Sequence, residues 1–179
     1  MGKYCLYKLL GNIPVTCSIP SNGVKDLYLM HAEDVRLTTD VLNGAIAGVV
    51  FSPGARSYRI EGFKQNIQIT SAIRTLEAST RLDFSVTFKI PSEESGTMAN
   101  LRNERAFMNG KFYALVVLNS SAAYFIGNTS PLECSGADYD SNTNGGLSTV
   151  TLTAPEGSAG NYRMGIIQEA IATIISKSV

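Results

Sequence analysis

The sequence has few of the residues on which most catalytic and metal sites depend. Its 179 residues include one histidine, His31, no tryptophan and three cysteines. Cys5, Cys17 and Cys134 form no C-x-x-C pair, which argues against a cysteine zinc site and against a complete disulfide framework. A catalytic triad would also need a nucleophile on a strained turn, and no G-x-S-x-G motif occurs. We therefore expect reduced thiols, no enzymatic activity and no cofactor.

Charge is scarce and balanced. Fifteen Lys/Arg residues stand against fifteen Asp/Glu, and charged residues make up 17% of the chain, compared with 44% hydrophobic residues. This composition excludes a disordered chain and gives no support to a strongly basic surface for nucleic acid. The sequence contains no apolar run long enough to span a membrane and no glycine-rich phosphate loop.

Alternation of apolar and polar residues predicts a mainly β protein. The clearest segment is Leu82–Ile90, which alternates without a break and is typical of a strand with one face in water. Further strands are expected at 27–30, 45–51, 58–63, 67–70, 112–118, 123–127 and 147–154.

Two segments have helical features. Ser92 as N-cap and Gly110 as C-cap predict a flanking helix over about 92–109. The last segment repeats isoleucine at helical spacing and needs a partner surface, either on its own domain or on a neighbouring subunit. The expected organisation is an arm or irregular strands over 1–56, a β-rich core with the helix over 57–160, and a C-terminal arm or helix over 161–179. The core is expected to be a β-sandwich or a partly closed antiparallel barrel.

The candidate metal site is a polar segment that resembles half of a calcium loop. Asp140, Asn142, Asn144 and then Gly145 match positions 1, 3, 5 and 6 of an EF-hand. The twelfth position is Thr151, where a bidentate glutamate should stand, so we do not assign a metal. The alternative is a tight turn at 144–146 between strands.

The order of these segments resembles that of bacteriophage tail-tube-type virion proteins, especially those of phages with Bacteroidetes-like hosts. The features that carry the resemblance are the strand Leu82–Ile90, a helix that ends in a tight turn, the apolar strand 114–118, its aromatic partner 123–128, and a polar loop over 135–146 that ends in Asn-Gly-Gly before 147–156. The resemblance covers somewhat more than half of the chain, and its motifs are turns and strands.

The resemblance implies a structural subunit that forms a ring, a hexamer or dodecamer, in the tail or the head–tail connector. Such a protein is made in the host cytoplasm and resides in the virion, where it contacts other tail or connector proteins and DNA passes through it without sequence-specific binding. We expect a passage that is not rich in Lys/Arg. The alternative is a surface- or carbohydrate-binding β-sandwich, as in a fibre or adhesin. The contacts between subunits are expected at Ile166, Ile167, Ile171, Ile174, Asp138 and Asn144.

Overall fold

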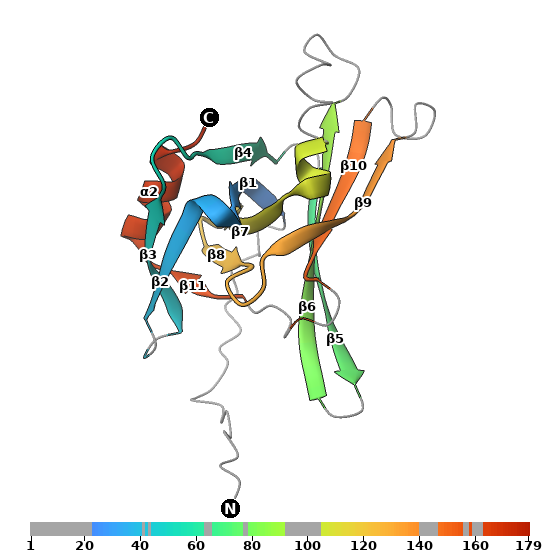
Figure 1. Cartoon of the computed structure of the whole chain (residues 1–179), viewed down its shortest axis with the longest axis horizontal. Helices are drawn as coiled ribbons and strands as arrows, with labels where there is room; N and C mark the ends of the chain where they lie inside the picture. The colour runs from blue at the N-terminus through green and yellow to red at the C-terminus, as the bar shows by residue number, and fades with distance from the viewer. Residues whose placement is uncertain are drawn as a thin grey trace, which may run out of the picture.

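The protein is mainly β, as the sequence predicts. The computed structural model describes residues 23–40, 42, 44–62, 66–76, 79–91, 105–139, 147–155, 158 and 163–179. In this part of the chain an eight-stranded antiparallel sheet is joined by a three-stranded mixed sheet and a C-terminal helix (Figure 1). The larger sheet does not close into a barrel, because its path ends at β4 on one side and at β5 on the other.

The larger sheet runs in the order β4-β1-β7-β9-β10-β6-β5, and β8 pairs with β7 beside β9. Its strands are β1 (Val24–His31), β4 (Ser57–Glu61), β5 (Ile67–Leu76), β6 (Ser79–Pro91), β7 (Lys111–Leu118), β8 (Ala123–Ile126), β9 (Leu132–Tyr139) and β10 (Leu147–Thr153). The smaller sheet, in the order β11-β3-β2, contains β2 (Val35–Asp40), β3 (Ala45–Phe51) and β11 (Gly165–Ile166).

The larger sheet changes direction where β7 meets β9. Only two residue pairs join these strands, and beyond them β8 takes over the same edge of β7. The β1–β7 part and the β6–β10 part can therefore face each other around one core. That core contains Leu27 and Val116 from the first part and Val86, Phe88 and Leu152 from the second, all fully buried.

A second core lies on the other face of β1 and β7. Residues 26–30 are buried without interruption, because Leu27 and Leu29 face the first core while Tyr28 and Met30 face the second. The smaller sheet and α2 (Gln168–Ser176) cover this second core. Residues 24–31, which fall in the segment expected to be an arm or irregular strands, form β1 between β4 and β7.

Most of the predicted strands are present, and Leu82–Ile90 lies within β6 with Phe84, Val86 and Phe88 buried on one face. The flanking helix is present over 105–109, and the rest of its expected range lies outside the described residues. The polar loop expected at 135–146 is wrong for residues 135–139, which belong to β9 and pair with β10. The sequence analysis also missed β2, which pairs with β3 after the short 3₁₀ turn η1 (Ala32–Asp34).

Candidate functional site

The isoleucines expected to contact other subunits lie mostly against their own chain. Ile174 is fully buried in the second core, and Ile166 and Ile171 pack against the same cluster. Ile167 remains exposed at the start of α2. Of the two surfaces that the sequence left open for the C-terminal segment, the structure therefore supplies the one on its own domain.

Hydrogen bonds fix the end of this segment on β4. The buried Ser57 hydroxyl donates to the carbonyl of Ile174 at 2.7 Å. The backbone N–H of Ser57 donates to the carbonyl of Lys177 at 3.1 Å, and the N–H of Val179 donates to the carbonyl of Ser57 at 3.1 Å. The C-terminal residues thus occupy the start of the outer edge of β4.

Of the remaining predicted site residues, the structure describes Asp138, near the end of β9. Asp138 is exposed and pairs with Thr149 of β10 in the strand register. Asp140, Asn142 and Asn144 lie outside the described residues, so the calcium-loop hypothesis stays a prediction. Elsewhere, the described part of the chain contains no group of three His, Cys, Asp or Glu side chains that could hold a metal ion. Cys134 is a free, part-buried thiol.

A cavity of about 550 Å³ opens between the two ends of the larger sheet. Its aromatic wall includes His31 at the end of β1, whose ring lies 4.8 Å from the ring of Phe112 and 5.9 Å from that of Tyr58. The ring of Phe107, from the helical residues 105–109, lies 5.6 Å from that of Phe112 in a tilted arrangement and also lines the cavity. We call this space the aromatic cavity. His31, the one histidine of the sequence, is thus part of its wall.

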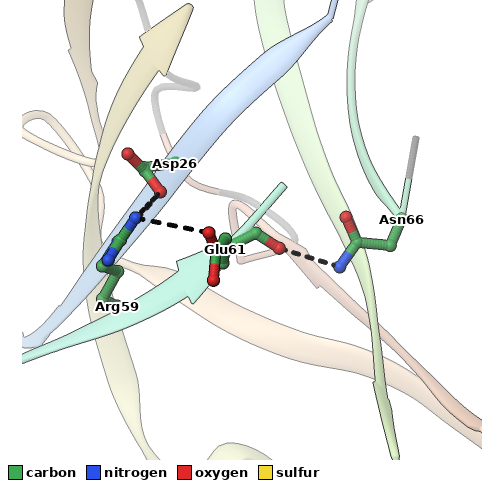
Figure 2. A network of polar contacts seen from close by, with 4 residues as sticks. All are labelled: Asp26, Arg59, Glu61 and Asn66. Atoms are coloured by element: carbon green, nitrogen blue, oxygen red, sulfur yellow. Dashed lines mark hydrogen bonds and ion pairs between the residues drawn. The ribbon is translucent and has the colours of Figure 1, made fainter. Parts of the chain in front are cut away.

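Polar groups lie at the side of the aromatic cavity (Figure 2). The guanidinium of Arg59 binds one carboxylate oxygen of the buried Asp26, with Nε at 2.9 Å and Nη2 at 2.8 Å, and it lies 3.7 Å from Glu61. The amide of Asn66 donates to the backbone carbonyl of Glu61 at 3.1 Å and so ties the start of β5 to the end of β4. This network joins β1, β4 and the residue that precedes β5.

The negative charge of Asp26 and burial shift the pKa of two groups, Arg59 and Tyr28. The hydrogen bond and the negative charge of Asp26 raise the pKa of the Arg59 guanidinium. Burial raises the pKa of Tyr28, the charge of Asp26 adds to the rise, and Arg59 opposes it. Arg59 therefore stays cationic at all physiological pH values and serves as the fixed partner of a buried carboxylate.

A third feature is the hairpin formed by β5 and β6. Its ten residue pairs run from Ile67 opposite Phe88 to Leu76 opposite Ser79, and Figure 1 shows it projecting beyond β9 and β10. Asp83 lies between two arginines, 3.1 Å from Nε of Arg74 and 2.8 Å from Nε of Arg81. No described strand pairs with the outer edge of β5.

Comparisons of the chain with protein-family models, with curated proteins and with solved structures find no match. No helix in the part of the chain that the structure describes is long and apolar enough to cross a membrane. The candidate functional sites are therefore the two features that the geometry identifies, the aromatic cavity and the projecting hairpin. Sequence reasoning missed both, although the alternation at 67–70 marked the start of β5.

Proposed function

We propose that the protein is a structural subunit that assembles with copies of itself into a ring in a phage tail or head–tail connector, and that DNA passes through this ring. The virion role comes from the sequence resemblance, together with the finer expectation of a tail-tube-like sandwich or partly closed barrel. Self-assembly is supported by one observation of its own, the unpaired edge of β5.

The outer edge of β5 is exposed and pairs with no described strand. All described side chains from Thr70 to Thr75 are exposed, and Ile73 is 72% exposed. Two-stranded ribbons are marginally stable in water, and long uncovered edges bind other strands unless the protein protects them. Neither a proline nor a lysine protects this edge within residues 67–76. A strand from a neighbouring copy would satisfy its free backbone groups.

The charges of the hairpin suit a passage for DNA. Arg74 and Arg81 share the carboxylate of Asp83, so two cations are partly neutralised by one anion. Every Lys or Arg that neutralises a phosphate adds affinity, so a wall with many unpaired cations would retain DNA. A hairpin with paired arginines is compatible with a wall along which DNA slides.

The position of α2 narrows the choice of assembly surfaces. Because Ile166, Ile171 and Ile174 lie against their own chain, the C-terminal segment offers less apolar surface to a neighbour than was expected, although Ile167 stays exposed. Strand edges are the alternative, and of the two end strands of the larger sheet β4 has its start covered by residues 177–179. We therefore assign the contact to the longer edge of β5.

The test is the absolute mass of the protein in solution, measured by light scattering after size exclusion. We expect a closed multiple for the parent protein and a monomer for Ile73→Lys, since a charge on the edge disfavours strand pairing. Ala172→Lys, which adds the same charge to an exposed position on α2, is the matched control and should keep the multiple. Circular dichroism should show all three proteins folded.

A parent protein that is monomeric at every concentration would overturn the proposal, as would a closed multiple that Ile73→Lys leaves intact. Electron microscopy of the multiple then decides its shape, because the proposal requires a ring with an open centre. A compact particle with no opening would exclude a conduit for DNA.

A further inference from the structure

One face of the β5-β6-β10-β9 part of the larger sheet carries mainly small hydroxyl side chains. The strand register places Ser85 between Thr70 and Thr153. It also places Thr87 opposite Thr151, and their hydroxyl oxygens lie 3.2 Å apart. The apolar side chains that alternate with them face the first core instead. We call this surface the hydroxyl face, defined by Thr70, Ser85, Thr87, Thr151 and Thr153.

The charges on the hydroxyl face are nearly balanced among the described residues. In the register of these strands, three cations share the face with three anions, namely Arg74, Arg81 and Lys89 with Asp83, Glu133 and Asp138. The two arginines bind the one carboxylate of Asp83. At the start of β7, Lys111 adds a further cation, which lies 3.0 Å from Glu133. The face therefore offers no block of cations that would hold a phosphate backbone.

The hydroxyl face is the uncovered side of this part of the sheet. Its other side packs against β1 and β7 around the first core, whereas no labelled helix or strand lies over the hydroxyl face in Figure 1. The face is also hollowed, since a space of about 640 Å³ is lined by Thr70, Ser85 and Thr153 among others.

This arrangement decides which way the face would point in a ring. A ring that joins copies through the edge of β5 sets their larger sheets side by side around the axis. The circumference of a ring grows with its radius, so the second layer of each copy, formed by β1, β7 and the smaller sheet, has more room on the outside. The single-layered, hollowed side then faces the opening.

We propose that the hydroxyl face lines the passage of the ring and is the surface along which duplex DNA slides. Hydroxyl groups exchange hydrogen bonds with water and phosphate oxygens, and the balanced charge adds little electrostatic retention. This inference rests on the proposed ring, and it assigns the part of the chain that DNA meets.

The experiment adds a cation to the hydroxyl face of every subunit through Thr151→Lys. Thr151→Gln has a long side chain without the charge, and Ala172→Lys places the same charge at an exposed position of α2, which covers the second core. Light scattering first shows which variants keep the closed multiple. Preformed rings are then mixed with linear duplex DNA, with the same DNA carrying streptavidin on both biotinylated ends, and with a closed circle of the same sequence, and retention is measured by gel shift.

Cations inside a closed ring can be reached only by a DNA end that threads through it. Thr151→Lys rings should therefore retain open-ended linear DNA at least about tenfold more tightly than the closed circle or the blocked DNA, because each added cation that meets a phosphate strengthens binding. The parent and Thr151→Gln rings should retain none of the three, and Ala172→Lys rings should not distinguish linear DNA from the circle. Thr153→Lys, on the same face, replaces Thr151→Lys if that variant does not assemble.

An intact ring of either lysine variant that binds the closed circle as tightly as linear DNA would overturn the inference, because the face would then lie on the outside. Intact rings that retain no linear DNA would overturn it as well. Both results leave the proposed ring standing, whereas a parent protein that forms no ring overturns the proposed function and the inference together.

Discussion

Removal of Arg59 tests the buried ion pair beside the aromatic cavity. The side chain of Asp26 is 8% exposed, and both of its close contacts to Arg59 fall on one oxygen. Leaving a buried charge without its partner costs about 3–5 kcal/mol in a fully buried pair. The side chain of Arg59 is 42% exposed, so water screens the pair and the cost of Arg59→Ala should fall to about 2 kcal/mol.

The other half of the pair should behave differently. Asp26→Ala leaves a half-exposed guanidinium, which water can solvate, so this variant should lose only about 1 kcal/mol. The double variant should then be more stable than Arg59→Ala alone, because no charge remains buried. Arg74→Ala is a matched control, since its side chain is 69% exposed and its partner Asp83 keeps Arg81.

Urea denaturation at neutral pH and constant protein concentration measures the free energy of unfolding of all four variants. In a thermal unfolding experiment, a loss of about 2 kcal/mol in a chain of this length lowers Tm by roughly 4–8 °C. The reasoning is refuted if Arg59→Ala is no less stable than Asp26→Ala, or if the two single losses simply add in the double variant. Either result would mean that the carboxylate of Asp26 does not need the guanidinium.

Two further predictions concern ionisation and backbone packing. Burial raises the pKa of Tyr28 and of Tyr124 above the unfolded value of about 10. The contribution of the two phenols to stability is therefore complete below that pH and is lost as the pH rises through the folded pKa. Replacing both residues with Phe should flatten the decline of the urea midpoint at alkaline pH, and an unchanged decline would contradict this explanation. Gly62→Ala should cost about 2 kcal/mol in the same assay, because a Cβ there would overlap the carbonyl oxygens of Val24 and Lys25. Gly54 lies in an exposed turn with positive φ and has open space around it, so Gly54→Ala should lose only the cost of its backbone strain.

The strands that could be predicted are those in which the pattern of apolar and polar side chains reflects which faces are buried. β6 and β10 alternate because one face meets the first core, and β1 is apolar from Leu27 to Met30 because both of its faces are covered there. β9 has no such pattern, since the polar residues Glu133, Ser135 and Asp138 are typical of a loop. Backbone pairing with β10 holds it in the sheet, with a shift of register between Thr151 and Leu152. A strand that is held in the sheet by backbone hydrogen bonds to its neighbour cannot be predicted from the pattern of its own side chains.

A segment's own side chains also do not reveal which surface it packs against, which explains why the isoleucines expected to contact other subunits lie mostly against their own chain. The isoleucine spacing indicated a C-terminal arm or helix over 161–179 that needs a partner surface, and α2 forms over Gln168–Ser176. Spacing does not say which surface is the partner. β3 and the second core supply it within the chain. The aromatic cavity was equally hidden, because His31, Tyr58, Phe107 and Phe112 come from four separate segments that only the curl of the larger sheet brings together.

The feature on which the proposed assembly rests is the incomplete burial of one strand edge. A ten-residue open edge with Ile73 in water exposes apolar surface that costs solubility. That cost disappears when a second copy covers the edge. The same sheet that stays open at β5 also leaves the aromatic cavity between its two ends, so both features follow from a larger sheet that does not close into a barrel.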